Sequence, residues 1–475
     1  MAFGLVAAAC GSDDDAAPAT TVADADAGDT DTDTDTDTDT DMDTDTDTDM
    51  DSGDALPLEG SVEVAAGTVL DLDECPSDWD PTQGITDDEI RVGWTGPQSG
   101  PLAAFGEIAE GMEAYFAWVN ENDPVDGKRI VLSARDDAYE AGRAVANVEE
   151  MIETDNLFFF AHSIGTPINV ALRPVTDEAC VPQLFNSTGF PIWGDPATWP
   201  WTTGFILDYI VEGEIWCNTI VEEHGEGATV AALYMNNDFG KNYETAMQNC
   251  AADGRIELVA EELHDQAAPD VTNEMTTMVA SGADVFVSGT TAAFCPQTVA
   301  SVAASEWRPS FYMSYTCNNL ASFFTPVIEQ AQLLADDGHG VRMVNSNKIC
   351  GDPTYEDDPA IQASREILRE YGNVECEDGS FSTGIIYGEV IEKALRATAA
   401  LPGGLNRVNL MSAVWNFDQP SEYLLAGQWR LDGVNDAYFT ESGQVQEVVV
   451  VDGALTFSAV GDTVDFEGAG GSVGS

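Results

Sequence analysis

Apolar positions between residues 84 and 204 alternate between short continuous runs and longer stretches with helical spacing. Within residues 104–122, Ile108, Met112 and Val119 recur at intervals of four and seven, which predicts a helix with one buried face. Strand and helix signals that alternate in this way are typical of βαβ units with a parallel sheet. The predicted strands are 90–94, 129–134, 157–161 and 181–185, and the predicted helices are 104–122, 141–153 and 167–178.

A second series of the same kind follows residue 204. Two consecutive series indicate an α/β protein with two similar lobes. Ligands of such sheets lie at the carboxyl ends of the strands, so we expect a binding site in the cleft between the lobes. The predicted helices of this series are 209–223, 243–252, 271–281 and 296–305, and the predicted strands are 229–234, 256–261, 285–288 and 311–314.

The N-terminal stretch lacks this pattern. An apolar run, Leu5–Ala9, precedes Cys10 and resembles the end of a bacterial lipoprotein signal, so residues 1–9 are expected to be a truncated signal and Cys10 a lipidation site. Asp and Thr then alternate over residues 29–49, where charges repel and nothing can be buried. We therefore expect a disordered, acidic, lipid-anchored spacer over residues 10–83. A calcium loop is not expected, because the Asp–Thr stretch has no Gly for its tight turn.

The charge of the chain argues against a nucleic-acid partner. The formal net charge is −68, from 85 acidic and 17 basic residues. A surface this acidic repels nucleic acid, and it suits a salty environment in which self-repulsion is screened. No apolar run reaches the roughly 20 residues that span a bilayer. Membrane attachment is therefore expected only through the lipid on Cys10.

Several motifs together resemble one family of transport proteins. The stretch Gly84–Gly93, followed by Ser99-Gly100-Pro101 and Phe105-Gly106, is similar to the opening of the leucine/isoleucine/valine-type periplasmic binding proteins of ABC transporters. Residues Ala161–Pro167 resemble the ligand loop of that family, and Asn237–Tyr243 resemble the aromatic-Gly loop of its second lobe. The likeness runs from about residue 84 to about residue 451.

This resemblance implies a type I periplasmic-binding-protein fold, in which each lobe is a mainly parallel sheet flanked by helices. It implies a first lobe of residues 84–207 plus 348–428 and a second lobe of residues 208–347 plus 429–468. The hinge is then expected at three crossovers, near Gly204, Asn347 and Trp429. It also implies no enzymatic activity, no cofactor and no metal, and a membrane permease as partner.

The resemblance further implies which residues contact a ligand. In the family, backbone N–H groups and hydroxyls of two first-lobe loops hold the ligand carboxylate, as helix N-termini can. The matching residues are Gly165, Thr166, Thr188 and Phe190. An aromatic that packs on the ligand corresponds to Phe105, and the second lobe is expected to contribute Phe239, Thr290, Thr291 and Thr316.

One position departs from the family pattern. Relatives that bind amino acids carry an acid after the strand that corresponds to 311–314, whereas Thr316 stands here. A buried ammonium without a carboxylate is costly. An amino-acid ligand would therefore need Asp208 or Glu107 to reach the cleft; amides, urea-like molecules and small organic or aromatic acids stay open. Trp193, Trp199, Trp201 and Tyr315 are expected either to wall a flat ligand or, for the tryptophans, to pack near the hinge.

Nine cysteines indicate an oxidising compartment, and eight remain when Cys10 is set aside. Eight cysteines allow about a hundred connectivities, so the pairing is a topological hypothesis. Helices on either side of one strand carry Cys217 and Cys250. The ends of neighbouring strands carry Cys295 and Cys317, and one helix is bracketed by Cys350 and Cys376. The predicted pairs are Cys75–Cys180, Cys217–Cys250, Cys295–Cys317 and Cys350–Cys376.

The sequence thus predicts an extracytoplasmic solute-binding lipoprotein that delivers a small polar ligand to an ABC importer by cleft closure. A ligand-sensing receptor of the same fold is the alternative. A hydrolase is not expected, because the chain has neither a Gly-x-Ser-x-Gly nor a His-Glu-x-x-His motif.

Overall fold

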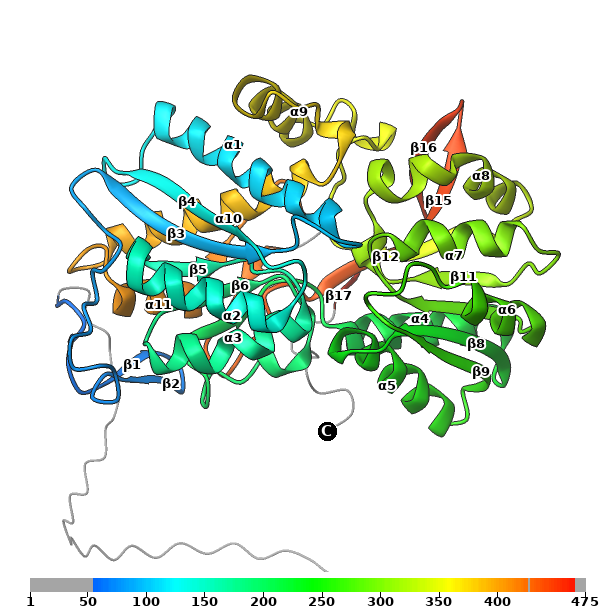
Figure 1. Cartoon of the computed structure of the whole chain (residues 1–475), viewed down its shortest axis with the longest axis horizontal. Helices are drawn as coiled ribbons and strands as arrows, with labels where there is room; N and C mark the ends of the chain where they lie inside the picture. Colours follow the sequence, from blue (N-terminus) through cyan, green and yellow to red (C-terminus); the bar gives the residue numbers. More distant parts are fainter. Residues whose placement is uncertain (1–53, 426–427, 466–475) are drawn as a thin grey trace, which may run out of the picture. The chain divides into compact units, whose positions relative to one another are not determined.

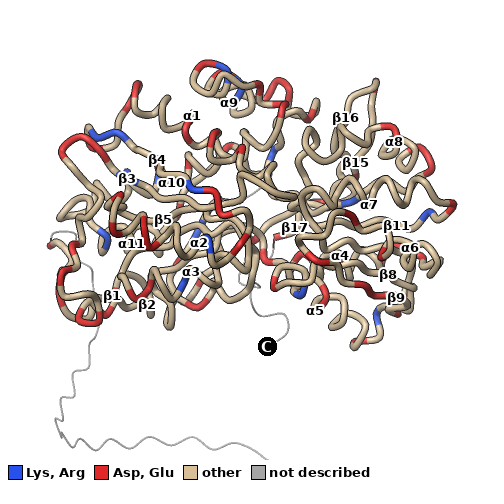
Figure 2. The backbone as a smooth tube through the Cα atoms, viewed as in Figure 1, with Lys and Arg blue, Asp and Glu red and all other residues tan. Residues whose placement is uncertain are grey.

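A computed structural model describes residues 54–425 and 428–465, which lie in one compact unit of the chain (Figure 1). Cys10 and the Asp–Thr stretch lie outside the described residues, so the lipidation site stays a prediction. The described residues form two α/β lobes, which confirms the predicted fold class. Figure 2 shows that acidic residues occur along the backbone of both lobes, with few basic residues between them.

The first lobe is built on a five-stranded parallel sheet with the order β4-β3-β5-β6-β7. Helices α1, α10 and α11 pack on one face and α2 and α3 on the other. The strands are β3 (Glu89–Gly96), β4 (Arg129–Asp136), β5 (Phe159–Ala161), β6 (Gln183–Asn186) and β7 (Thr202–Gly204). The helices are α1 (Glu107–Asn122), α2 (Ala141–Glu150), α3 (Thr166–Glu178), α9 (Pro359–Ile367), α10 (Phe381–Ala400) and α11 (Arg407–Trp415).

The second lobe has a sheet with the order β16-β15-β12-β11-β10-β8-β9, in which the five strands from β12 to β9 are parallel. β15 and β16 extend it antiparallel, and β17 pairs with β15. The strands are β8 (Ala228–Met235), β9 (Ile256–His264), β10 (Val285–Gly289), β11 (Ser310–Met313), β12 (Val341–Asn345), β15 (Ser442–Val451), β16 (Ala454–Ala459) and β17 (Val464–Asp465). The helices are α4 (Tyr209–His224), α5 (Asp238–Ala252), α6 (Thr272–Ser281), α7 (Phe294–Ala303) and α8 (Ile328–Asp336).

Local sequence explains why these elements begin and end where they do. Seven of the eight residues of β8 are buried, as expected for a parallel strand covered on both faces. The side chain of Asn237 accepts hydrogen bonds from the N–H groups of Phe239 and Gly240 and so begins α5. Gly282, in the left-handed region, ends α6.

The ordered fold begins earlier than the sequence predicted. β1 (Ser61–Ala65) and β2 (Thr68–Asp71) form an antiparallel hairpin inside the segment assigned to the spacer. Val62, Val64 and Leu70 are buried, and the carbonyl of Val64 accepts hydrogen bonds from two side chains of the α11 region. The spacer boundary at residue 83 is therefore wrong, because alternating apolar residues after residue 60 have a surface to pack against.

The chain passes between the lobes three times. It passes between β7 and α4, between β12 and Cys350, and between Phe439 and β15. The third crossover was predicted at Trp429, which is wrong. Trp429 belongs to the small sheet of β13 (Asp418–Gln419) and β14 (Trp429–Arg430), and its ring lies 5.7 Å from that of Phe205 in the first lobe. This aromatic contact keeps the chain in the first lobe for about ten more residues.

All four predicted disulfides are present, with Cα–Cα distances of 5.6 to 6.1 Å. Cys75–Cys180 ties the segment after the β1–β2 hairpin to the end of α3. Cys217–Cys250 links α4 to α5 within the second lobe. No helix in the described part of the chain is both long and apolar enough to cross a membrane.

Candidate functional site

A cavity of about 120 Å³ lies between the two lobes and is lined by residues of both. A single water needs roughly 10–15 Å³ of such volume, so the cavity has room for a small organic ligand. Seven aromatic residues line it: Phe105, Tyr139, Tyr209, Phe239, Tyr315, Phe323 and Tyr387. Its polar lining residues are Ser187, Thr291, Thr316, Asn318, Asn319, Asn347, Lys348, Ser380, Ser382 and Thr383.

The predicted ligand residues divide into two groups. The cavity is lined by Phe105, Gly165, Phe239, Thr291 and Thr316. The others, Thr166, Thr188, Phe190 and Thr290, are not among the described residues that line it. The hydroxyls of Thr166 and Thr188 are hydrogen-bonded to each other at 2.7 Å, and both side chains are fully buried. Thr188 and Phe190 line a separate space of about 10 Å³ instead. The hydroxyls of Thr166 and Thr188 thus lie behind the wall of the main cavity.

The start of α3 forms one part of the first-lobe wall. Gly165 precedes the helix with a φ of 102°, and no side chain caps the helix. A Cβ atom at this position would lie 2.2 Å from the ring of Tyr139, so only Gly lets this ring lie against the helix start. Burial raises the pKa of the Tyr139 phenol, so that it stays uncharged.

The second-lobe wall is a short turn, η4 (Tyr315–Cys317), which follows β11. The hydroxyl of Ser314 accepts the N–H of Thr316, and the Ser314 and Thr316 hydroxyls lie 2.9 Å apart. Cys317 is bonded to Cys295 and lies against the carbonyl of Thr290. The turn that carries Thr316 is therefore covalently joined to the start of α7, which directly follows the loop that carries Thr291.

A fully buried acid, Glu212 of α4, supports this turn from behind. Its Oε1 accepts the N–H of Tyr315 at 2.9 Å, and its Oε2 accepts the hydroxyl of Tyr243 at 2.6 Å. The Tyr243 hydroxyl also lies 2.8 Å from that of Ser314. Burial raises the pKa of Glu212 to about 8, although both hydrogen bonds oppose this shift. Glu212 is therefore mainly uncharged at neutral pH, and no pattern in the sequence pointed to it.

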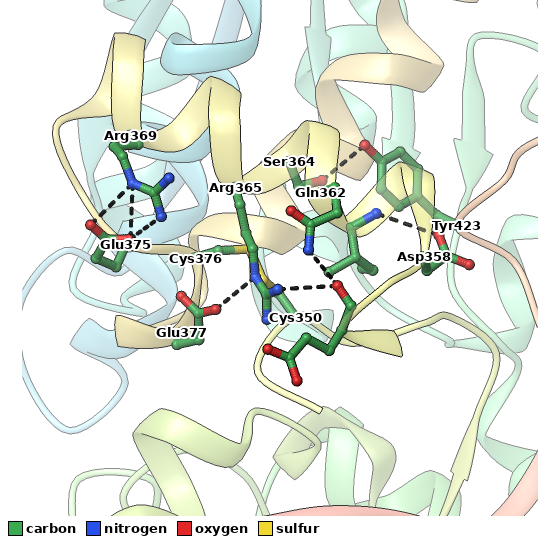
Figure 3. Close-up of a disulfide and its surroundings, with 12 residues drawn as sticks. Cys350, Asp358, Gln362, Ser364, Arg365, Arg369, Glu375, Cys376, Glu377 and Tyr423 are labelled. Atoms are coloured by element: carbon green, nitrogen blue, oxygen red, sulfur yellow. Dashed lines mark hydrogen bonds and ion pairs between the residues drawn. A yellow bond between two sulfur atoms is a disulfide. The ribbon is translucent and has the colours of Figure 1, made fainter. Parts of the chain in front are cut away.

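The hinge supplies a third part of the wall. Asn347, Lys348 and Ile349 line the cavity just after β12, and Ser380, Ser382 and Thr383 line it at the start of α10. The Cys350–Cys376 disulfide joins these two stretches, and Figure 3 shows it beside the ion pairs of Arg365 with Glu377 and Arg369 with Glu375. The ammonium of Lys348 lies 2.6 Å from the carboxylate of Asp358.

Sequence reasoning missed Lys348 and the residues of α10 as cavity residues. Lys348 directly follows the predicted crossover at Asn347, and this position was the one signal for it.

The lobes touch at several points around the cavity. The rings of Phe105 and Phe323 meet edge to face with centroids 6.0 Å apart. On another side, the side-chain amide of Gln266 donates to the carbonyl of Tyr139 at 3.4 Å. The amide of Asn319 donates to the hydroxyl of Ser380 at 3.3 Å. The structure thus has the lobes closed on the cavity.

No Asp or Glu is among the described residues that line the cavity. Of the two acids considered for an ammonium, Glu107 accepts the N–H of Ser380 at 2.7 Å, and Asp208 accepts the N–H of Ile210 at 2.7 Å as the cap of α4.

The tryptophans considered for a flat ligand do not line the cavity either, although Tyr315 does. Instead, the guanidinium of Arg173 lies over the ring of Trp199 at 4.2 Å and near that of Trp193 at 5.3 Å. Trp201 is buried in the first-lobe core. Their role is packing near the hinge.

Two α/β lobes that close around one cavity, with three crossovers between them, define a two-lobed solute-binding protein. The chain belongs to the periplasmic binding protein family, which it matches over residues 89–420. This confirms the resemblance found in the sequence. This family and the similar solved structures are solute-binding proteins and not enzymes, as predicted.

Individual relatives are distant. The chain is 23% identical over 210 residues to the Leu/Ile/Val-binding protein homolog 3 of Brucella melitensis biotype 1; this match covers 42% of the chain and spans 54% of that relative's length.

Solved structures are similar over most of the chain. One is a branched-chain amino acid ABC transporter protein from Thermus thermophilus with bound valine, which has a TM-score of 0.69 and 18% identity, covering 80% of this chain and 97% of that one. Another is a solute-binding protein from R. palustris in complex with 4-hydroxybenzoate, with a TM-score of 0.65 and 21% identity, covering 82% and 100%. A fatty acid ABC transporter substrate-binding protein from Thermomonospora curvata has a TM-score of 0.66 and 16% identity, covering 81% and 94%.

Proposed function

We propose that this protein is the extracytoplasmic solute-binding component of an ABC importer and that it closes its lobes around one small organic molecule. The observation that carries this proposal is the cavity between the lobes, which is lined by residues of both and has room for a small ligand. The candidate ligands are branched-chain amino acids, amides or urea, and small carboxylates. Neighbours of the same fold are described with valine and with 4-hydroxybenzoate, which supports this range.

Closure follows from where the contacts lie. Phe105, Gly165 and Tyr139 belong to the first lobe, whereas Phe239, Thr291 and Thr316 belong to the second. A ligand between these groups interacts with both lobes only when they are closed, so its binding free energy favours the closed form. The three crossovers act as the hinge, and the closed form is the one that a permease would recognise.

Attachment to the membrane is the second part of the proposal. A lipid on Cys10 would hold the protein at the outer face of a membrane, and the acidic stretch after it would let the binding unit move near its permease. Family membership supports a place outside the cytoplasm, and the four disulfides fit an oxidising compartment.

A thermal-shift screen tests ligand binding. The panel contains branched-chain amino acids, primary amides, urea, and small aliphatic and aromatic carboxylates, including 4-hydroxybenzoate. A ligand present at 100 times its Kd stabilises the folded form by about 2.7 kcal/mol, which raises the melting temperature measurably. A panel that produces no shift at millimolar concentration would rule out the proposed ligand range.

A pair of glycine variants tests the cavity itself. Gly165→Ala places a methyl group against the Tyr139 ring, so it should weaken binding of any hit from the screen by more than about tenfold. Gly127→Ala is the matched control, because Gly127 also has a positive φ, of 72°, but a Cβ atom added there would have nothing within 4 Å. If both variants reduce the affinity equally, the loss of affinity comes from backbone strain and not from a change in the cavity.

A further inference from the structure

The chemistry of the cavity wall narrows the ligand class, and this inference rests on the proposed binding function. An ammonium group needs an anionic partner when water is excluded, because an unpaired buried charge is costly. Lys348 is the one charged residue among the described residues that line the cavity. The wall therefore has no group to neutralise the ammonium of a zwitterionic amino acid.

Three acids near the wall already accept hydrogen bonds or an ion pair from other groups. Both carboxyl oxygens of Glu212 accept hydrogen bonds, from Tyr315 and Tyr243, and burial raises its pKa so that it is mainly neutral at pH 7. Glu107 accepts the N–H of Ser380 at the start of α10. Asp358 is paired with Lys348 and caps α9. Glu212 and Asp358 are therefore not available to an ammonium without breaking a bond that the fold uses, and Glu107 is held at the start of α10 through its Oε2.

The same wall favours a carboxylate. Helix α3, which has 13 residues, begins at the cavity without a side-chain cap and without an acid in its first turn. Its N-terminus carries a partial positive charge. The phenol of Tyr139 lies at this end, where it can accept from the helix and donate to an anion. The ammonium of Lys348 has three N–H groups, and Asp358 occupies only one side of it.

Two buried hydroxyls without partners indicate independently that the cavity binds a polar atom of a ligand. The hydroxyl of Thr291 is buried without a hydrogen-bond partner, and only 4% of the residue is exposed, although it lines the cavity. The buried hydroxyl of Tyr315, another lining residue, also lacks a partner. Buried polar groups are rarely left unsatisfied, so these two hydroxyls are expected to donate to, or accept from, a bound molecule.

We propose that the cavity selects a monocarboxylate with a flat or branched apolar body and no ammonium group. The aromatic wall, with Phe105, Phe239 and Phe323 among its residues, contacts the apolar body. The start of α3, Tyr139 and Lys348 hold the carboxylate. Thr291 and Tyr315 bind a further polar atom where the ligand has one, and Thr316 replaces the acid that an ammonium would need.

Three compounds of matched size test the class by isothermal titration calorimetry with the full chain at pH 7. They are 3-phenylpropanoate, its neutral analogue 3-phenylpropanamide, and L-phenylalanine, which adds an ammonium to the same skeleton. We expect 3-phenylpropanoate to bind at least about tenfold more tightly than the other two. Tighter or equal binding of L-phenylalanine overturns the proposal. Tighter or equal binding of the amide also overturns it, and so does the absence of binding by all three.

A lysine pair separates a charge effect from a general loss of fold. Lys348→Met should weaken 3-phenylpropanoate binding by about tenfold, as expected for a charge-assisted hydrogen bond. Lys393→Met is the control, because Lys393 is also ion-paired in the first lobe, with Glu389, but does not line the cavity. Equal losses in the two variants overturn the assignment of Lys348. If the thermal-shift panel instead identifies a ligand of another class, the proposed binding function is supported and only the monocarboxylate proposal is wrong.

Discussion

The two lobes build their halves of the cavity in different ways. The first lobe presents the positive end of a helix, the start of α3, with Gly165 and the Tyr139 ring beside it, and lines the rest of its half with side chains such as Phe105 and Tyr387. The second lobe presents the side chains of two loops, which are joined by Cys295–Cys317 and supported from behind by Glu212. The partial positive charge at a helix N-terminus favours any small anion, whereas fixed side chains distinguish one ligand from another. The difference indicates that the start of α3 favours an anionic group, whereas the second-lobe loops hold their polar side chains in fixed positions for the rest of the ligand.

Removal of a disulfide tests this comparison with the largest expected effect. Replacing both Cys295 and Cys317 by Ser should lower the free energy of unfolding by roughly 3 to 4 kcal/mol, as expected when a loop of 22 residues is released. It should also weaken 3-phenylpropanoate binding by about tenfold, because the loops with Thr291 and Thr316 lose their covalent link. Denaturant unfolding and calorimetry measure the two effects.

The control is Cys217–Cys250, which lies in the same lobe and closes a loop of 33 residues. Neither of its cysteines lines the cavity. Its removal should cost a similar free energy of unfolding and leave the affinity unchanged. If both double variants bind 3-phenylpropanoate like the wild type, the second-lobe loops do not need their link. The comparison between a helix start and a set of fixed side chains would then be wrong.

Substitution of Glu212 is expected to have the next largest effect on stability. Glu212→Ala leaves the N–H of Tyr315 and the hydroxyl of Tyr243 without their shared acceptor, which should destabilise the protein by about 2 kcal/mol. Glu212→Gln keeps the shape and an acceptor oxygen, so it should retain most of the stability and of the affinity at pH 7. Equal destabilisation by the two variants would show that the hydrogen bonds of Glu212 contribute little.

The pH dependence of Glu212 has a definite sign. The pKa is raised to about 8 in the folded protein from 4.5, so between these values the folded form keeps a proton that the unfolded form has lost. Stability therefore falls as the pH rises through this window, by at most about 1.4 kcal/mol per pH unit. The melting temperature of the wild type, minus that of Glu212→Gln, should decrease from pH 5 to pH 8. Parallel curves for the two proteins would contradict a neutral, buried Glu212.

The fold could be predicted from the sequence where a single element carries its own signal. Strand β8 is a continuous apolar run because it is buried on both faces, and the order of such runs and helices indicated two lobes. Three of the four disulfides could be predicted because each joins elements that the topology already places together, and Cys75–Cys180 was the pair that remained. The crossover at Trp429 was misplaced because Trp429 packs on Phe205, a partner more than 200 residues away that no local pattern reveals.

The cavity could be predicted only in part, for the same reason. Residues in the loops after strands, such as Gly165 and Thr316, follow from the strand pattern and the family likeness. Tyr387 does not, since it reaches the cavity from the middle of α10 and hydrogen-bonds to Ser187, 200 residues earlier in the chain. Glu212 is similarly hidden, because its burial depends on the packing of three elements and not on its neighbours in sequence.

The smallest expected effect concerns the contact between the lobes. Phe105→Ala removes the edge-to-face pair with Phe323, a contact worth about 1 kcal/mol that exists only when the lobes are closed. The affinity for 3-phenylpropanoate should therefore fall at least about fivefold, because Phe105 also contacts the apolar body of the ligand, with little change in the unfolding of either lobe. Phe190→Ala is the control, because the Phe190–Trp193 pair has a similar geometry but lies within the first lobe. The family likeness, however, places Phe190 at the ligand carboxylate. A larger loss of affinity in Phe190→Ala than in Phe105→Ala would favour that assignment and would mean that the first lobe contributes side-chain specificity as well.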